Sequence, residues 1–228
     1  MEKAYPQIRQ ELLALRDEKG FQAYCSPSGK STDIGAWNVY YLDLHSVNLE
    51  ENRRRCPLTT KLLDGIPRKY GHAFFSATAP KTHITPHHGP TSKKLRCQLP
   101  LVCAPDSCRL RVHDDTIILK EGEMILFDDS FEHEAWNDHE TKSRLVLIFD
   151  VWHPDLSEKE IKFLNFLQTA ALKRQQRLLQ EHEEGAKENT TPPPSKNFFT
   201  LIRDGMQAGV ADLNGEVWAG THHSNAPL

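Results

Sequence analysis

The first seventy residues of the chain predict two helices with a strand between them. Apolar side chains recur at helical spacing over residues 6–19, and Gly20 is suited to end that helix. Residues 35–44, GAWNVYYLDL, are aromatic and β-branched, which favours a strand. A polar stretch follows, and a short apolar helix is predicted around Leu62 and Leu63.

Between residues 71 and 153 the pattern changes to short apolar runs that are separated by turn residues. No long helix is predicted between these runs, so they favour a sandwich or barrel of antiparallel strands. The predicted strands are residues 72–79, 94–102, 108–115, 116–120, 123–129 and 143–152.

The last third of the chain begins with a helix signal. Ser157 and Glu160 form a capping box, and the apolar residues that follow keep helical spacing along one face. Residues 188–196, ENTTPPPSK, are typical of a proline-rich linker. We therefore divide the chain into a folded domain over residues 1–157, an amphipathic charged helix over 158–186, and a linker with a C-terminal tail over 187–228.

Composition narrows the choice of partners and compartment. A net charge of -3 and a pI near 6.5 argue against a nucleic-acid partner. No apolar run has the length of a membrane helix and the N-terminus is not a signal peptide, so we expect a cytoplasmic protein without a membrane span. The five cysteines lack CxxC spacing, which favours reduced thiols: Cys25, Cys56, Cys97, Cys103 and Cys108.

The chain has 12 histidines, which is the unusual feature of its composition. Non-haem iron in oxygenases is held by two imidazoles, usually with one carboxylate, and a jelly roll places those imidazoles on paired strands. Upstream candidates lie in and before the segment TPHHGPTSKKLRCQLPL, and the downstream candidate lies in FDDSFEHEAWND. A histidine beside a Gly-Pro turn is otherwise an ordinary surface residue. The candidates are His83, His87 and His88 upstream and His133 downstream, with Asp128, Asp129 and Glu132 as possible carboxylate ligands.

Three long segments carry a family resemblance. PHHGPTSKKLRCQLPL, ILFDDSFEHEAWND and SRLVLIFDVWHPDLS resemble, in order and spacing, the catalytic domain of the aspartyl/asparaginyl β-hydroxylases, which are 2-oxoglutarate-dependent oxygenases. The match is strongest over residues 71–157 and does not cover the last seventy or so residues. It implies a mostly β fold with flanking helices and a double-stranded β-helix core, of the jelly-roll or cupin-like type.

The resemblance also implies an iron site. It makes His87 and His133 the ligands of Fe(II) and places Gly89 where most related oxygenases carry a carboxylate ligand. His88 holds a position that is not a ligand in the family. Asp129 resembles the acid that supports the iron-bound waters from outside the coordination shell.

The cosubstrate residues follow from the same match. Arg144 resembles the arginine that binds the distal carboxylate of 2-oxoglutarate, and Ser76 matches the hydroxyl partner at that end. Arg96 matches the residue near the metal-bound carboxylate. Gln98 departs from the family, which often has a histidine there, and a second departure is that Cys56 lacks a nearby cysteine partner. Trp37 aligns loosely with an aromatic that faces the active site, although core packing is the role we expect.

The implied reaction is hydroxylation of the β-carbon of an aspartyl or asparaginyl unit in a protein, peptide or small molecule, with Fe(II), 2-oxoglutarate and O₂ as cofactor and cosubstrates. Two alternatives stay open. One is a halogenase that binds halide at the vacant third-ligand position, and the other is a catalytically degenerate jelly roll that binds a ligand without turnover.

Overall fold

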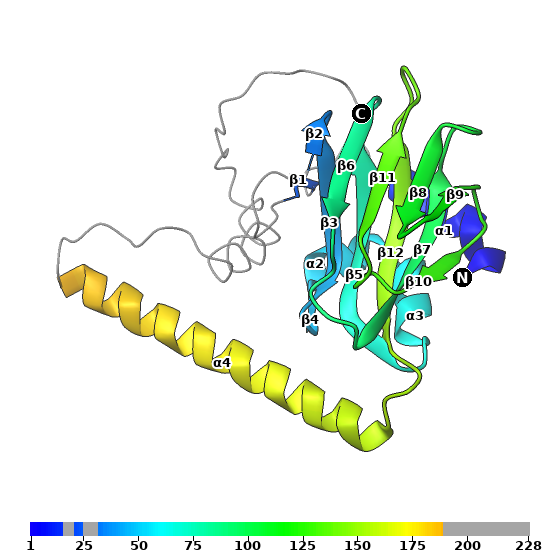
Figure 1. Ribbon diagram of the computed structural model, residues 1–228. Coiled ribbons are helices and arrows are strands. Elements are labelled where there is room, and N and C mark those ends of the chain that lie inside the picture. The colour runs from blue at the N-terminus through cyan, green and yellow to red at the C-terminus, as the bar shows by residue number, and fades with distance from the viewer. Residues whose placement is uncertain (16–20, 25–31, 189–228) are drawn as a thin grey trace.

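The computed structural model describes residues 1–15, 21–24 and 32–188 of the chain. Figure 1 shows two β-sheets packed face to face, with short helices on one outer side and one long helix that runs away from the sheets. All pairs of neighbouring strands in the two sheets of the described structure are antiparallel. The mostly β fold with flanking helices and a jelly-roll core, predicted from the sequence, is confirmed.

The larger sheet has seven strands in the order β1-β3-β5-β12-β7-β10, with β4 paired to β3 at the side. Its strands are β1 (Gln22–Ala23), β3 (Trp37–Leu44), β4 (Val47–Asn48), β5 (Lys69–Thr78), β7 (Lys94–Val102), β10 (Ile125–Phe127) and β12 (Arg144–Trp152).

The smaller sheet has five strands in the order β2-β6-β11-β8-β9. Its strands are β2 (Thr32–Ile34), β6 (Thr82–His87), β8 (Cys108–Val112), β9 (Asp115–Ile118) and β11 (His133–Asn137).

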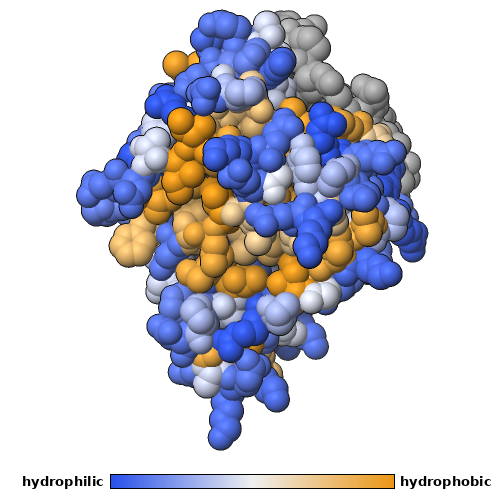
Figure 2. Space-filling view, turned by 90° about the vertical axis from the view of Figure 1, so that its right-hand side faces the viewer, coloured by the Kyte–Doolittle hydropathy of each residue, from blue (hydrophilic) through white to orange (hydrophobic). Residues whose placement is uncertain are grey.

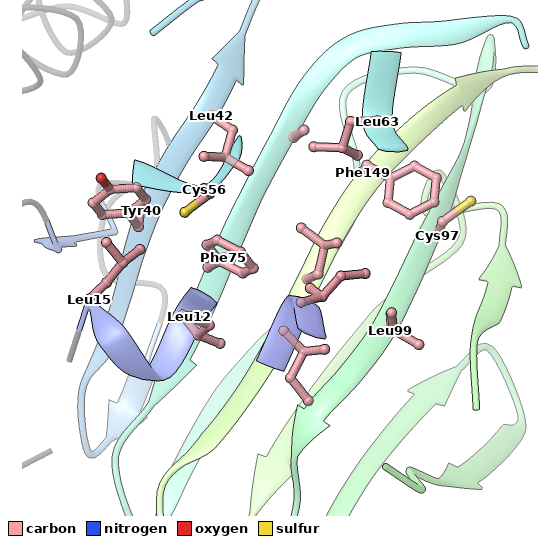
Figure 3. Packing of buried hydrophobic residues seen from close by; sticks show 14 residues of the cluster. Leu12, Leu15, Tyr40, Leu42, Cys56, Leu63, Phe75, Cys97, Leu99 and Phe149 are labelled. Atoms are coloured by element: carbon pink, nitrogen blue, oxygen red, sulfur yellow. The ribbon is translucent and has the colours of Figure 1, made fainter. Parts of the chain in front are cut away.

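Three helices lie on the outer face of the larger sheet and close its apolar core: α1 (Tyr5–Ala14), α2 (Glu50–Arg55) and α3 (Pro57–Asp64), with the short 3-10 helix η1 (Glu2–Ala4) before them. Figure 3 shows side chains of α1, α3 and the sheet meeting in one cluster, which includes Leu12, Leu63, Phe75, Leu99 and Phe149. Because successive side chains of a strand point to opposite faces, the neighbours of these core residues point between the two sheets.

The inner face of the larger sheet carries a small apolar cluster of Val39, Phe74, Val146 and Ile148, with polar residues beside it. On β7, Leu95, Cys97 and Leu99 alternate with Lys94, Arg96 and Gln98, and Gln98 and Arg96 face Ile148 and Asp150 of β12. This alternation places the polar residues of the candidate site in the space between the sheets.

The long helix α4 (Glu158–Glu188) begins at the predicted capping box. The Ser157 amide donates to Oε2 of Glu160 at 2.7 Å, and the Glu160 amide donates back to the Ser157 hydroxyl at 3.3 Å. The predicted helix over residues 158–186 matches α4 within two residues. The proline-rich segment and tail lie almost wholly at residues 189–228, outside the described residues, and the division into domains stays a prediction.

The structure differs from the predicted elements in several places, among them the short elements η1, β1, β2 and β4, which were not predicted. The first helix is described only to Leu15, since residues 16–20 lie outside the described part of the chain. The polar stretch after β3 is helical as α2. Strands β6 and β11, which carry His87 and His133, were absent from the predicted strands. Their sequences, THITPH and HEAWN, contain few apolar residues, so they show little apolar alternation.

One edge of the sandwich exposes apolar side chains. Figure 2 views the side on which β9, β10 and α1 lie in Figure 1, and it shows an apolar area among polar side chains. The exposed large hydrophobic residues of this region are Ile117, Ile118, Met124 and Leu126.

Two expectations about compartment can be compared with the structure. Among the described residues, no helix is long and apolar enough to cross a membrane. The four cysteines in the described ranges, Cys56, Cys97, Cys103 and Cys108, are buried, and Cys25 lies outside those ranges.

Candidate functional site

Two histidines from neighbouring strands meet at the inner side of the smaller sheet. His87 ends β6 and His133 begins β11, and the two residues are register partners. Their ring centroids are 4.1 Å apart. The expectation that the two imidazoles lie on paired strands is confirmed for this pair.

Both rings are oriented by the backbone. Nδ1 of His87 lies 2.7 Å from the Thr85 carbonyl oxygen, and Nδ1 of His133 lies 2.9 Å from that of Phe131. A carbonyl oxygen only accepts, so each Nδ1 carries the proton and each Nε2 presents a lone pair. Burial lowers the pKa of both rings, and the neighbouring His87 helps to lower that of His133 to about 4. The pair is therefore neutral at neutral pH, as metal ligands must be.

Gly89 leaves no room for a side chain at its position. A Cβ there would lie 2.5 Å from Cγ of Asp129 and 2.6 Å and 2.7 Å from its carboxylate oxygens. The Gly89 amide also donates to the Asp129 carbonyl at 2.6 Å. The space that a carboxylate ligand at residue 89 would need is filled by the Asp129 carboxylate.

A network of buried charges holds Asp129. Nζ of Lys94 donates to both Asp129 oxygens, at 2.8 Å and 2.7 Å, and lies 3.0 Å from Oδ2 of Asp150. Arg96 bridges the same two carboxylates, with Nη1 3.1 Å from Asp129 and Nε 3.0 Å from Asp150. Burial raises the pKa of Asp150, but Arg96, His72 and Lys94 outweigh it and the pKa is lowered. Two cations thus face two carboxylates beside the histidine pair.

Arg144 lies on the same inner face, at the other end of β12 from Asp150, and some of its N–H donors have no partner among the described residues. Its side chain is 2% exposed, and Nη2 donates to Oε1 of Gln98 at 3.3 Å. Nε and Nη1 have no hydrogen-bond partner among the described residues, and the same is true of the Thr78 hydroxyl. Thr78 is the register partner of Arg144 on β5. Burial lowers the pKa of Arg144.

The hydroxyl of Ser76 completes this group. Ser76 lies two residues before Thr78 on β5, so both side chains are on the inner face. Its hydroxyl accepts a 2.9 Å hydrogen bond from the indole N–H of Trp37, which stacks on Tyr24 at 3.8 Å. Unsatisfied buried donors are rare in folded proteins, so Arg144 and Thr78 are candidates to bind an acceptor.

The structure brings most predicted site residues onto facing surfaces of the two sheets. The other candidate metal ligands, His83, His88, Asp128 and Glu132, make contacts of their own elsewhere. His83 faces outward, between Asp33 and Glu134. His88 hydrogen-bonds the Ser130 carbonyl oxygen. Glu132 pairs with Arg111, and Asp128 accepts from the Ser130 amide. No group of three or more His, Cys, Asp or Glu side chains suited to a metal occurs in the described ranges.

Sequence reasoning missed four residues of this region: Lys94, Asp150, Thr78 and Trp37 in its hydrogen-bonding role. Lys94 and Asp150 have a signal in the sequence. Lys94 lies two residues before Arg96, and Asp150 lies an even number of residues after Arg144 on the same strand, so both should point inward. Thr78 has the same signal, two residues after Ser76.

Comparison with known proteins identifies relatives of this chain. The model of the Aspartyl/Asparaginyl beta-hydroxylase family matches residues 2–154. The human aspartyl/asparaginyl beta-hydroxylase is 34% identical over 72% of this chain and 22% of its own length. The human aspartate beta-hydroxylase domain-containing protein 2 is 35% identical over 65% of this chain and 43% of its own length.

A bacterial relative has a different name. The ornithine lipid ester-linked acyl 2-hydroxylase of Rhizobium tropici is 34% identical over 73% of this chain and 60% of its own length. The chain thus spans less than two thirds of each of these three relatives. Among solved structures, an oxidoreductase of the 2OG-Fe(II) oxygenase family from Burkholderia pseudomallei matches with a TM-score of 0.46 and 14% identity, over 65% of this chain and 81% of that one.

Proposed function

The chain belongs to the aspartyl/asparaginyl β-hydroxylase family, and we propose on this basis that it is an Fe(II)- and 2-oxoglutarate-dependent dioxygenase. Its proposed reaction is hydroxylation of the β-carbon of an aspartyl or asparaginyl unit in a protein, peptide or small molecule. The observation that carries the proposal is the buried Arg144 guanidinium, whose Nε and Nη1 have no hydrogen-bond partner among the described residues.

The residues present fit a two-histidine iron site. His87 and His133 would hold Fe(II) through Nε2, because their Nδ1 atoms are committed to backbone carbonyls. Gly89 is consistent with this, since the neighbouring Asp129 carboxylate excludes a side chain at residue 89. When bound, Fe(II) supplies the redox chemistry with O₂ that couples C–H hydroxylation to conversion of 2-oxoglutarate into succinate and CO₂.

The proposed role of Asp129 is electrostatic and orienting. Lys94 and Arg96 hold its carboxylate in place, and it lies beside the position that a third protein ligand would take. From there its carboxylate can accept hydrogen bonds from water at the iron site and hold that water in place. Its ion pairs with Lys94 and Arg96 disfavour direct coordination, because both cations would have to give up an acceptor.

The cosubstrate site is proposed at Arg144. The five-carbon 2-oxoglutarate has a carboxylate at each end, and a guanidinium can donate two parallel hydrogen bonds to one of them. Nε and Nη1 each offer a donor that has no partner among the described residues, and the hydroxyls of Thr78 and Ser76 can provide more from β5. Arg96 lies nearer the histidine pair, where it contributes positive charge for the other carboxylate.

Gln98 has a positioning role in this proposal. Its side-chain oxygen accepts from Nη2 of Arg144 at 3.3 Å and so helps to fix the orientation of the guanidinium. A neutral amide is sufficient for that task, so the departure from the family histidine leaves the cosubstrate site complete.

The two alternatives are less favoured by the same contacts. A halide bound in place of a third ligand would lie against the Asp129 carboxylate, which repels anions. A module that had lost catalysis would have no reason to keep both the histidine pair and a buried, unsatisfied arginine. The substrate itself is proposed from the family name, and two relatives that are each 34% identical have names that imply different substrates.

The test is a turnover assay with a substrate panel. Purified protein with Fe(II), 2-oxoglutarate and O₂ should produce succinate, and an aspartyl or asparaginyl peptide should gain the mass of one oxygen atom. His87→Ala should abolish both signals, whereas His83→Ala, on the outer face, should retain them. Chloride-dependent addition of chlorine would instead establish a halogenase, and binding without succinate would establish a non-catalytic module.

A further inference from the structure

Helix α4 exposes large apolar side chains that nothing in the described part of the chain covers. Phe163 is 61% exposed, Phe166 is 66% exposed, and Leu167 and Leu178 are each 45% exposed. The helix is attached over its first part, where Ile161 is buried, Arg68 pairs with Glu158 at 3.0 Å, and the Gln168 side chain hydrogen-bonds Tyr70. Beyond that point Figure 1 shows it running away from the sheets.

The same helix is locally basic in a chain that is net acidic. Residues 161–180 contain no Asp or Glu and four cations, Lys162, Lys173, Arg174 and Arg177, whereas the whole chain has a net charge of -3. All four of these cationic residues are exposed. The acidic residues of the helix lie outside this segment, at its two ends.

The aromatic and cationic residues share one face. Positions seven and eleven residues apart on a helix lie within about 20° of each other around the axis, because a turn takes 3.6 residues. Phe163 is eleven residues before Arg174, and Phe166 is seven residues before Lys173 and eleven before Arg177. A flat surface that contacts the phenylalanines therefore contacts the cations as well.

We propose that this face of α4, defined by Phe163, Phe166, Leu167, Lys173 and Arg174, docks the protein on an anionic membrane surface. Phenylalanine and leucine side chains insert at the boundary between headgroups and acyl chains, while lysine and arginine pair with lipid phosphates. The apolar side chains of this face, at residues 163–167, precede its cations, at residues 173 and 174, along one helix. A bilayer surface is broad enough to contact both groups at once. The proposal does not rest on the oxygenase activity.

The experiment uses the full chain and lipid vesicles of two compositions. Vesicles of phosphatidylcholine mixed with phosphatidylglycerol should carry the protein to the top of a flotation gradient. Vesicles of phosphatidylcholine alone should bind it roughly tenfold less, since they offer Lys173 and Arg174 no anionic lipid. Added salt should release the protein from the mixed vesicles.

Two variants and a control assign the binding to α4. The double variant Phe163→Ser/Phe166→Ser and the double variant Lys173→Glu/Arg174→Glu should each reduce binding roughly tenfold or more. Ile34→Ser is the matched control, because Ile34 is 62% exposed on β2 and its loss should leave binding unchanged. Circular dichroism should show every variant folded, since the altered side chains are exposed.

Three results would overturn the proposal. The first is no flotation with either vesicle, and the second is equal flotation of the wild type and both α4 variants. The third is a dimer in sedimentation that Phe163→Ser/Phe166→Ser dissolves while vesicle binding is absent, which would give the face to a second copy of this chain.

Discussion

Replacing Thr78, whose hydroxyl has no partner among the described residues, should change protein stability and 2-oxoglutarate affinity in opposite directions. Thr78→Val replaces a buried hydroxyl that has no partner in the described structure with a methyl group of similar size. Removing an unsatisfied polar group should stabilise the free protein by about 1 kcal/mol. The same change should weaken 2-oxoglutarate binding roughly tenfold, because a charged carboxylate loses one donor.

Thermal unfolding and cosubstrate titration measure these two effects separately. A variant that lost both stability and cosubstrate affinity would show that Thr78 is structural rather than a ligand residue. Thr60→Val is a suitable control, because its buried hydroxyl donates to the Cys56 carbonyl oxygen at 2.9 Å and its loss should only destabilise.

Gly89 leads to a second prediction at the scale of the residue. In Gly89→Ala the new methyl group must displace Asp129 or the Gly89 backbone, since the nearest atom would lie at 2.5 Å. We expect a loss of about 1–3 kcal/mol of stability, together with weaker Fe(II) binding. Thermal unfolding and metal titration check this.

The control is Gly65→Ala, at a site where the nearest atoms would be 3.5 Å and 3.7 Å from the added carbon. That variant should be close to neutral. Equal behaviour of the two alanine variants would contradict the view that Asp129 fills the third-ligand space.

At the scale of the element, a side chain of α1 caps the N-terminus of α3. The Glu11 carboxylate accepts the backbone amides of Leu58 and Thr59, at 2.7 Å and 2.9 Å, and the Thr59 hydroxyl at 2.6 Å. Helix α3 has no side-chain cap of its own, and its positive N-terminal end attracts a carboxylate.

Glu11→Ala should therefore lower the free energy of unfolding by about 1–3 kcal/mol. Chemical denaturation measures it, with Glu51→Ala as the control, because Glu51 makes only an exposed pair with Arg54. A Glu11 variant as stable as the control would show that α1 is held to α3 by apolar packing alone.

The sequence predicts elements well where one face of the element is apolar. The strand around residues 94–102 alternates Leu95, Cys97 and Leu99 with polar residues, and it is observed as β7. β6 and β11 were not predicted, because in THITPH and HEAWN the polar outer residues and the functional histidines leave few apolar positions. Local patterns alone therefore missed the strands that carry the candidate metal ligands.

The candidate site shows the same limit. Long motifs indicated His87, His133, Ser76, Arg96 and Arg144, and their roles stay proposals. Which cation pairs with which carboxylate depends on strand register: Arg96 meets Asp150 only because those residues are partners between β7 and β12. Register is set by the packing of the whole sheet, so no local pattern states it.

At the scale of the whole molecule, the larger sheet divides its two faces between stability and chemistry. Helices α1 to α3 cover the outer face with an apolar core, while the inner face keeps a row of buried charges and unsatisfied donors. Strands on which core and polar residues alternate are rigid, so the candidate site is positioned by the same packing that stabilises the fold.

Stability should depend on pH through His45, in the turn after β3. Burial, followed by the nearby His72, lowers the pKa of His45 from 6.5 to about 4. The unfolded chain then binds a proton between those values that the folded chain does not, so stability falls as the pH falls from 6.5 towards 4. The loss should be about 1–3 kcal/mol at pH 4.

His45→Asn removes this contribution and suits the backbone, because residue 45 has a φ of 50° and asparagine tolerates that conformation. Urea unfolding at several pH values compares the two proteins. An unchanged pH dependence in the variant would assign the effect to other groups.

In the proposed site, His87, His133 and Arg144 bind Fe(II) and 2-oxoglutarate together. The most direct measurement is the visible absorption of the purified protein, mixed with both under anaerobic conditions. The wild type should show the charge-transfer band of a chelated 2-oxoglutarate, His133→Ala should lose it, and Arg144→Gln should need much more cosubstrate to reach it. Absence of the band in wild type that demonstrably binds iron, or its persistence in His133→Ala, would contradict the account.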